Sequence, residues 1–386
     1  MRILFLDSPA FAKEDMISAF RSCGIQCDRF IHVDYKERQS QNFETAFFKN
    51  IEKNKYDFVF SFNYFPILSH CCQKYDIKYV SYVYDSPLVA LYSCTLINPC
   101  NYVFLFDKAT YLTFHNAGIQ TVYYLPLAAN VKRLTALKCP ESIREKISSD
   151  VSFIGSLYNE EHNFYDRLTG ISDYTRGYLD SIMTAQQQIY GEFILEDLLT
   201  SDILKDLEKV LPYKPMPDGT ETVAFVYANY FLCRKITSNE RLSLLKAASE
   251  QFQLKLYTHK ATNELSKAEF IGPVDYYNTM PLVFQNSRIN LNITLKSIHT
   301  GIPLRCMDIM GSGSFLLSNF QSDFLDYFVP GEDFAYYESP EDFITKIKYY
   351  LSHEKERRQI ISNCTGKMRD AHTFEHRAKS IINLLN

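Results

Sequence analysis

The sequence predicts an α/β protein made of two doubly wound parallel-sheet domains in tandem. Short apolar runs alternate with helical patterns along the first third of the chain, as they do in parallel sheets. The alternation begins again at "VSFIGSLYN" (151–159), after a polar stretch at 128–150. The 386 residues are enough for two domains of ordinary size.

Composition favours a globular enzyme of the cell interior. Hydrophobic residues are 46% and charged residues 22% of the chain, and the net charge of −4 argues against nucleic acid as a main partner. The start "MRILFLDSP" is too short and too soon charged for a signal peptide, and no run approaches the ~18 apolar residues of a membrane span. We therefore expect a cytoplasmic protein with no transmembrane segment and no nucleic-acid partner. The oligomeric state does not follow from the sequence.

The ten cysteines do not form a metal site or a disulfide framework by their spacing. No C-x-x-C pair and no Cys/His zinc spacing occur. Reduced, mostly buried thiols are the expectation for such cysteines in a cytoplasmic protein.

The first domain is expected at 1–128. Its helix at 12–24 ends in Gly, which is a helix-stop signal. Its apolar strands are expected at "RILFLD" (2–7), "YDFVFSFN" (56–63), "KYVSYVYD" (78–85), "NYVFLFD" (101–107) and "QTVYYLPL" (120–127).

Four of these strands end on a polar residue, namely Asp7, Asn63, Asp85 and Asp107. The ligand crevice of an open parallel sheet lies beyond the carboxyl ends of its strands, so all four are site candidates. Asp and Asn also begin turns and cap helices, and for Asp7 and Asp107 both interpretations stay open. For Asp85 we favour a place in the ligand site, because "YDSP" puts its carboxylate beside a turn fixed by proline.

Several common motifs are missing. The first strand is followed by "DSPAFAKED" without G-x-G-x-x-G, so a dehydrogenase-type dinucleotide site is not expected. The sequence also lacks a P-loop, H-E-x-x-H, G-x-S-x-G and an EF-hand loop.

The second domain is expected at 150–370, with a helical insert at about 160–210. A loop at 212–221 follows the insert. We expect further strands at 253–259, 267–275, 288–294 and 314–319, helices at 239–252, 280–287 and 322–328, and one long helix at 339–361 capped by Ser339. The last segment, 372–386, is expected to be an amphipathic helix.

The stretch "GIPLRCMDIMGSGSFLLS" (301–318) is the strongest candidate site of the second domain. Pro303 suits the start of a helix, whose unpaired N–H groups and partial positive charge attract phosphate. Gly301 lets a ligand approach the backbone. Arg305 and Asp308 stand three residues apart and share one helix face. They either bind phosphate and ribose or pair with each other in an internal salt bridge.

Four stretches carry a family resemblance: "FIGPVDYYNTMPLVFQNSRINLNIT" (270–294), "GIPLRCMDIMGSGSFLLSNF" (301–320), "GEDFAYYESPEDF" (331–343) and "AHTFEHR" (371–377). With them, residues 267–377 resemble the C-terminal half of GT-B glycosyltransferases, most nearly the spore-maturation-protein-like group. The stretches "YDFVFSFNYFPI", "YVYDSP", "NYVFLFD" and "YLPLAANV" are similar to that group's first domain. The resemblance covers most of the chain except the insert. It implies two Rossmann-like domains facing across a cleft, and a C-terminal helix, 372–386, that packs back on the first domain.

The resemblance also implies donor-binding residues. In related retaining enzymes two glutamates with seven residues between them frame the 301–318 loop; the second holds the ribose and the first lies near the donor sugar. Alignment on "GIPL" places Asp308 at the second position and Thr300, beside His299, at the first, so one carboxylate is missing. The expected donor-binding residues are Gly155, Ser156, Tyr276, His299, Thr300, Gly301, Ile302, Arg305 and Asp308.

The relatives often carry an Arg and a Lys after the strand that corresponds to "VSFIGS", and these neutralise the pyrophosphate. This chain has Ser156 there, followed by Glu160 and Glu161. We expect the phosphate charge to be met by Arg305, His299, Lys296 and the helix N-terminus instead. Tyr276 either stacks on the base or packs in the core.

No D-x-D sequence stands at a strand end, and GT-B enzymes resemble one another in requiring no bound metal. We therefore predict no metal and no cofactor, the nucleotide-sugar being a substrate. A general base must lie beside the acceptor hydroxyl, and we expect Asp85 in this role, with Asp7 and Asn63 also on the acceptor side.

The resemblance implies a glycosyltransferase that moves a sugar from a nucleotide-diphosphate donor, with UDP expected. The acceptor is expected to be a glycan, a protein or another cell-surface or spore-related molecule. Two alternatives remain open. Thr300 and the missing Arg/Lys pair favour a non-catalytic GT-B homologue that binds a partner. A GT-B-fold sugar-nucleotide epimerase is the other, and turnover of donor without acceptor would identify it.

Overall fold

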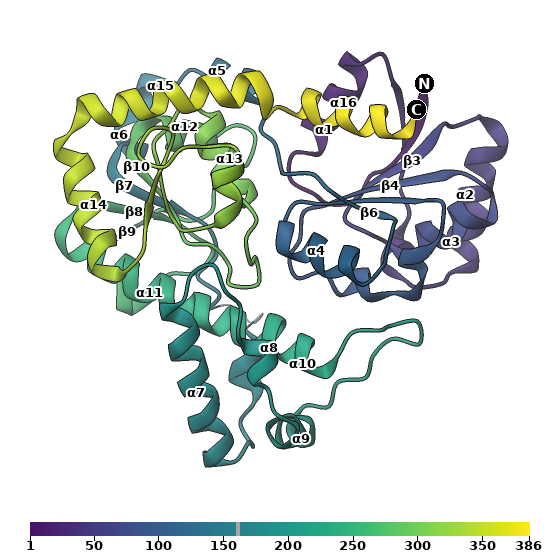
Figure 1. Ribbon diagram of the computed structural model, residues 1–386. Coiled ribbons are helices and arrows are strands. Elements are labelled where there is room, and N and C mark those ends of the chain that lie inside the picture. The colour runs from purple at the N-terminus through teal and green to yellow at the C-terminus, as the bar shows by residue number, and fades with distance from the viewer. Residues whose placement is uncertain (160–162) are drawn as a thin grey trace. The chain divides into compact units, whose positions relative to one another are not determined.

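The computed structural model describes residues 1–159 and 163–386 and divides them into two compact units (Figure 1). The first unit contains Met1–Ala128, Pro215–Thr222 and His372–Asn386, and the second contains Ala129–Lys214 and Val223–Ala371. Glu160, Glu161 and the expected start of the insert (160–162) lie outside the described residues.

The first unit is a six-stranded parallel sheet with the order β2-β1-β3-β4-β5-β6. Its strands are β1 (Arg2–Leu6), β2 (Gln26–Phe30), β3 (Phe58–Phe62), β4 (Lys78–Val83), β5 (Asn101–Leu105) and β6 (Val122–Tyr124). The chain leaves β1 toward β2 on one side and returns to β3 on the other. The carboxyl ends of β1 and β3 are therefore a topological switch point, the usual place of a ligand crevice.

Helices cover both faces of this sheet, which explains its continuous apolar strands. Helices α2 (Gln41–Lys53) and α3 (Pro66–Lys74) pack over Leu4 and Val59. Helix α1 (Lys13–Ser22) places Phe20 on Phe58 and Phe60 at the opposite face. The remaining elements of the unit are η1 (Val33–Lys36), η2 (Val89–Tyr92), η3 (Cys94–Ile97), α4 (Lys108–Asn116) and α16 (Phe374–Leu385).

The C-terminal helix α16 belongs to the first unit and lies along α1 (Figure 1). Arg377 is buried there and donates hydrogen bonds to the carbonyl oxygens of Pro126, at 2.7 Å, and Leu127, at 3.1 Å. Lys78 of β4 donates to the carbonyl of Leu385 at 2.6 Å. The end of the chain is thus fixed by hydrogen bonds as well as by apolar packing.

A short arm, Pro215–Thr222, also lies in the first unit although its neighbours in sequence do not. Asp218 pairs with Arg38 at 3.1 Å and accepts a hydrogen bond from Ser93. Its backbone carbonyl accepts the Cys94 N–H at 2.8 Å, and Thr220 donates to the Tyr92 carbonyl at 2.7 Å. Two backbone bonds and an ion pair therefore hold the arm beside η2 and η3.

The second unit repeats the architecture, with the strand order β12-β11-β10-β7-β8-β9, all parallel. Its strands are β7 (Ser149–Ile154), β8 (Leu254–Tyr257), β9 (Glu269–Phe270), β10 (Ser287–Asn292), β11 (Leu316–Asn319) and β12 (Ala335–Tyr337). Its helices at the sheet are α5 (Val131–Ala136), α6 (Glu141–Ile147), α11 (Cys233–Gln251), α12 (Met280–Asn286), α13 (Leu304–Gly311), α14 (Pro340–Ser352) and α15 (Glu354–Ala371), with the short η6 (Asn263–Leu265) and η7 (Ser322–Asp326).

The two faces of this second sheet differ in polarity. Val151, Phe153 and Leu291 point to the apolar face, which α11 and α14 cover. The opposite face carries buried polar side chains whose hydrogen bonds are satisfied within the sheet. Ser152 donates to Asn290 at 2.9 Å, and the neighbouring Asn292 donates to Ser318 at the same distance.

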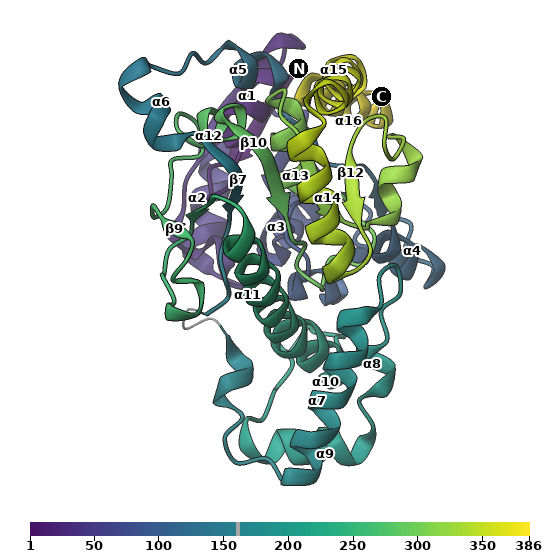
Figure 2. The same ribbon diagram turned by 90° about the vertical axis from the view of Figure 1, so that its left-hand side faces the viewer.

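The insert of the second unit is helical, as expected, and projects from the sheet in both views (Figures 1 and 2). It contains η4 (Phe164–Arg167), α7 (Asp173–Gln188), α8 (Leu195–Leu198), α9 (Ser201–Val210), α10 (Val223–Val226) and the π-helical η5 (Tyr227–Leu232). Helix α11 continues from η5 and runs back to the sheet, so the insert and the sheet share one helix.

Several elements differ from expectation. Strands β2 and β12 are additional; β2 is the polar edge strand "QCDRF", of which only Phe30 is buried, so it lacks an apolar signature. The single helix expected at 339–361 is wrong, because α14 ends at Ser352 and α15 starts at Glu354 after a break at His353. The predicted cap is confirmed: Ser339 accepts the Asp342 N–H at 3.1 Å.

Throughout the described ranges, no helix is both long enough and apolar enough to cross a membrane.

Candidate functional site

The candidate site of the second unit lies at its topological switch point. Strand β7 is central, and the chain fills β8 and β9 on one side before it returns to β10 on the other. The loops that leave the carboxyl ends of β7 and β10 therefore diverge, and such a switch point is where α/β sheets usually bind ligands. Gly155 and Ser156 follow β7, and the loop from Ile293 to Pro303 joins β10 to α13.

Arg241 of α11 joins these two loops. Its Nε and Nη2 groups both donate to the carbonyl of Ile293, the first at 3.0 Å, and its Nη1 donates to the carbonyl of Ser156. Its guanidinium lies 5.3 Å from the ring centre of Phe153 and 4.8 Å from that of Tyr158. Burial lowers its pKa from the usual value.

The turn after β7 is tightly packed. A Cβ at Gly155 would lie 3.3 Å from the Phe153 ring, closer than most Cβ contacts, so a side chain here would displace its neighbours. The hydroxyl of Ser156 accepts the Tyr158 N–H at 2.8 Å. Tyr158 itself has a φ of +54°, the left-handed conformation that bulky residues rarely adopt. The two predicted residues here thus shape the backbone of the loop.

The loop after β10 is tied to its surroundings at several points. The Lys296 N–H donates to the Thr237 hydroxyl of α11 at 3.0 Å. The carbonyl of Thr300 accepts the Asp323 N–H at 3.1 Å, and that of Gly301 accepts from Gln321 at 3.2 Å. Ile302 is 1% exposed and anchors the end of the loop.

The insert supplies part of the same surroundings. The Lys296 ammonium pairs with Glu240 at 3.5 Å and lies 4.1 Å from the ring centre of Tyr190. The Tyr190 hydroxyl donates to Glu240 at 2.7 Å; burial and the nearby carboxylate raise the pKa of this phenol, so it keeps its proton. His299 stacks on Phe193, with ring centres 4.1 Å apart.

Helix α13 does not show the internal salt bridge that its spacing allows. Asp308 is 1% exposed and accepts a hydrogen bond from the Tyr276 hydroxyl at 3.0 Å. Arg305 instead donates to the sulfur of Met280 and lies 5.8 Å from the Phe284 ring centre. Tyr276 therefore comes together with Asp308, whereas the Arg305 guanidinium points to α12.

In the first unit, Asn63 and Asp85 come together at the carboxyl ends of β3 and β4. The Asn63 amide donates to the Asp85 carboxylate at 2.8 Å. The carbonyl oxygen of the same amide accepts the N–H groups of Tyr84, at 2.9 Å, and Asp85, at 3.1 Å. Asn63 has a φ of +59°, which asparagine tolerates better than most residues. The arrangement holds an exposed Asp85 in a fixed place.

Asp7 and Asp107 have other partners. Asp7 pairs with Lys13 and, at 3.0 Å, with Arg29. Burial raises the pKa of Asp7, but the hydrogen bonds from Lys13 and Arg29 outweigh it and hold the pKa below its usual value. Asp107 is the N-cap of α4 and accepts the Ala109 N–H at 3.1 Å.

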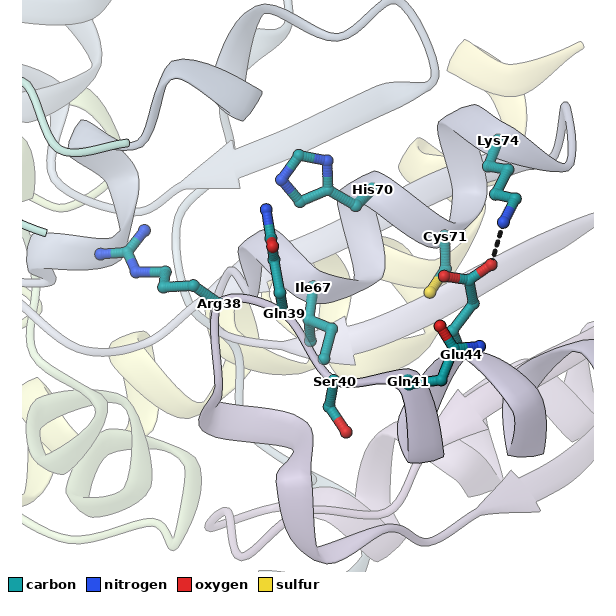
Figure 3. A pocket seen from close by; sticks show the side chains of 9 residues that line it. All are labelled: Arg38, Gln39, Ser40, Gln41, Glu44, Ile67, His70, Cys71 and Lys74. Carbon is teal, nitrogen blue, oxygen red and sulfur yellow. Dashed lines mark hydrogen bonds and ion pairs between the residues drawn. The ribbon is translucent and has the colours of Figure 1, made fainter. Parts of the chain in front are cut away.

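The first unit also contains a polar cavity of about 380 Å³ between α2 and α3 (Figure 3). Arg38 and the Lys74–Glu44 ion pair mark its opposite sides, and Gln39 and His70 lie between them. Its cations are already paired, Arg38 with Asp218 and Lys74 with Glu44. The cavity is therefore polar without an excess of unpaired positive charge on its lining.

Sequence reasoning missed Arg241, Glu240 and the insert residues Tyr190 and Phe193. The helical spacing carried a signal for Arg241, because it falls in the buried stripe with Thr237, Leu244, Leu245 and Ala248. A charged residue in such a stripe needs a polar partner. The sequence carries no such signal for Tyr190 and Phe193, because their partners are distant in the sequence.

A family model matches a part of the chain that contains part of this site. Residues 234–383 match the family described as "Glycosyl transferase-like". This range includes Arg241, the loop after β10 and all of α13. A search of curated proteins finds no significant match.

Solved structures give the fold of the whole chain. Sucrose-phosphate synthase from Thermosynechococcus elongatus is similar with a TM-score of 0.57 at 9% identity, over 100% of this chain and 98% of that chain. HepE of Anabaena, solved in complex with UDP and glucose, has a TM-score of 0.53 at 10% identity, over 100% and 99%. A glycosyltransferase from Rickettsia africae has a TM-score of 0.53 at 9% identity, over 100% and 97%. The chain has the GT-B fold.

Proposed function

We propose that this protein is a glycosyltransferase that moves a sugar from a UDP-sugar to a glycan, protein or other cell-surface acceptor. The observation that carries the proposal is the topological switch point between β7 and β10, because the loop after β10 enters α13 within the range that matches a glycosyltransferase-like family. HepE, similar in fold, was solved with UDP and glucose, and this supports UDP as the nucleotide.

In the proposed complex the diphosphate lies at Gly301 and the N-terminus of α13, where unpaired N–H groups favour an anion. Lys296 adds positive charge on the same loop, now shared with Glu240. Asp308 binds the ribose. Because Asp308 is buried under Tyr276, ribose contact requires the Tyr276 hydroxyl to move away, which also frees its ring to stack on the base.

On the acceptor side, Asp85 is the proposed general base. It takes the proton of the attacking hydroxyl, and the Asn63 amide fixes its orientation at 2.8 Å. A base of this kind matters most for direct displacement, in which the acceptor oxygen attacks the sugar carbon as UDP leaves. The missing carboxylate at Thr300 agrees better with that route than with a retaining one.

The test is UDP release from a panel of UDP-sugars, with mixed cell-surface glycans or peptides as acceptors. We expect acceptor-dependent release by the native protein, unchanged by EDTA because the proposal includes no metal. Asp85→Asn should lower the rate by about 10²–10⁴-fold, the usual contribution of a general base, and leave UDP affinity within about threefold. Equal rates for Asp85→Asn and the native protein would contradict the role of Asp85.

Two outcomes would favour the alternatives. Conversion of the donor to another UDP-sugar without acceptor would indicate an epimerase. Absence of UDP binding would indicate a non-catalytic homologue, for which Thr300 in place of a carboxylate is the supporting observation.

A further inference from the structure

Arg241 is a buried cation held by carbonyl oxygens instead of a carboxylate. It is 8% exposed, and within the described part of the chain it forms no ion pair. Ordinary buried charges are paired, because an isolated charge is costly to remove from water. Three of the five guanidinium N–H donors are used on the carbonyls of Ser156 and Ile293.

These two carbonyls are the places where the loops of the candidate donor site begin. Ser156 stands two residues after the end of β7, and Ile293 one residue after the end of β10. Backbone hydrogen bonds of the sheet join β7 and β10 only up to Leu291 and Phe153. Beyond that point, the planar fork of Arg241 connects the two diverging chains. Lysine, with a compact ammonium group, cannot reproduce such a fork.

We propose that Arg241 is a positioning residue that fastens the β7 and β10 loops together and so fixes the geometry of the donor site. This proposal rests on the proposed function, because it names what holds the diphosphate-binding loop in place. The Lys296 N–H, bonded to Thr237 one helical turn before Arg241, places the same loop on the same helix. Loss of the fork should therefore loosen both loops and weaken nucleotide binding without unfolding the sheet.

The chain offers a matched control in Arg357 of α15. Arg357 is 6% exposed, donates to the Tyr350 carbonyl, and has its pKa lowered by burial. It therefore has the burial and the carbonyl partner of Arg241, but it connects α15 to α14 and contacts neither loop. Arg241→Lys and Arg357→Lys remove equivalent groups from the two places.

The first measurement is amide hydrogen exchange of the ligand-free protein. In Arg241→Lys we expect the exchange rates of the Tyr158 and Lys296 amides to rise together by about tenfold or more, since both loops lose their hydrogen bonds to the guanidinium group. Arg357→Lys should leave both amides unchanged. Unchanged exchange in Arg241→Lys, or a rise at one loop alone, would overturn the proposal.

The second measurement is UDP binding by calorimetry. Arg241→Lys should weaken it by at least about tenfold, and Arg357→Lys by less than threefold. Millimolar guanidinium should restore much of the UDP affinity lost in Arg241→Ala, because the free cation can occupy the space that the side chain leaves. Arg357→Ala should keep its UDP affinity and should not respond to guanidinium. Absence of rescue in Arg241→Ala, or an equal gain in both variants, would contradict a specific role for the Arg241 fork.

The design separates this proposal from the proposed function. If the native protein fails to bind UDP, the donor assignment fails, while the exchange results still decide whether Arg241 fastens the loops. If the Arg241 variants do not fold, native-state exchange of the unmodified protein decides. The Tyr158 and Lys296 amides must then open as one unit with the same denaturant dependence; independent opening would overturn the proposal.

Discussion

At the scale of single residues, Asp308 and Tyr276 form the most informative pair. A hydroxyl hydrogen-bonded to a buried carboxylate keeps that carboxylate desolvated at little cost, because the group stays satisfied. A ribose diol offers the same kind of donor. The pair is therefore consistent with a site that exchanges an internal hydroxyl for one from the nucleotide.

This exchange gives the first prediction. Asp308→Ala should weaken UDP binding by about 10–100-fold, the usual loss for a hydrogen bond to a charged group. Tyr276→Phe should bind UDP within about threefold of the native protein, because the competing hydroxyl is removed while the aromatic ring stays. Isothermal titration of both variants checks this, and equal losses in the two would contradict the exchange.

Asp7 gives a prediction about pH. Its pKa is lowered in the folded state, so its ion pairs stabilise the protein above its unfolded value near 3.8, and this stabilisation is lost as pH falls through the lower folded value. Asp7→Asn should therefore lower the free energy of unfolding by ~2 kcal/mol at pH 7.

Denaturant unfolding of native and Asp7→Asn protein between pH 7 and pH 3 measures the effect. The difference between them should stay constant above about pH 5 and shrink below pH 4. A difference that grows as the pH falls would contradict the assignment. The predicted pH dependence would give Asp7 a structural role in the first unit, and Asp85 is the proposed base.

Individual partners explain where sequence reasoning about residues succeeds and where it stops. For Asp107 the sequence allows either a site residue or a helix cap. The cap is a local interaction, so it follows from adjacent residues. Arg29, one of the two partners of Asp7, lies 22 residues away, and Tyr276, the partner of Asp308, lies 32 residues away, so no short-range pattern gives these contacts. Residue types at strand ends indicate the crevice, but tertiary contacts decide which of them are already engaged.

At the scale of elements, the packing of α13 depends on a glycine. A Cβ at Gly311 would lie 2.5 Å from the Cβ of Ala129 and 3.2 Å from a methyl group of Leu134 on α5. The first distance is shorter than Cβ contacts in proteins, and the second is tighter than most of them. Helix α13, which carries candidate donor residues, can therefore pack closely against α5 only because residue 311 has no side chain.

Gly311→Ala should lower the free energy of unfolding by ~1–3 kcal/mol, the usual cost of overpacking. Gly366→Ala on α15 is the control, because nothing lies within 4 Å of its Cβ. It should raise the free energy of unfolding by up to about 1 kcal/mol through helix propensity. Chemical denaturation measures both, and equal effects at the two glycines would refute the packing argument.

Elements were predictable where one physical signal dominates. The buried central strands β1, β3, β4 and β10 are apolar or alternating runs, and the structure confirms them. Edge strand β2 buries one side chain and has no such signal. The break at His353 interrupts a pattern that stays helical on both sides, so the sequence reads as one helix.

At the scale of the whole molecule, both units follow the same winding rule, and each places its candidate residues beyond the carboxyl ends of the strands. The alternation of strands and helices was sufficient to predict this fold class. The arm at Pro215–Thr222 was not predictable, because its place in the first unit depends on Arg38, Tyr92 and Cys94, which precede it by more than a hundred residues.

Both units of the chain are used in the proposed reaction, and binding of a nucleoside diphosphate to the second unit is its first requirement. Thermal unfolding with UDP, GDP, dTDP, CMP and ADP in turn measures this binding. A ligand at ~100 times its Kd adds about 2.7 kcal/mol to the free energy of unfolding, which raises Tm by several degrees. We predict that UDP raises Tm in the native protein and that the rise in Asp308→Ala is at most about half as large, because its UDP affinity is lower. A native Tm that none of the five nucleotides changes would contradict nucleotide binding by the second unit.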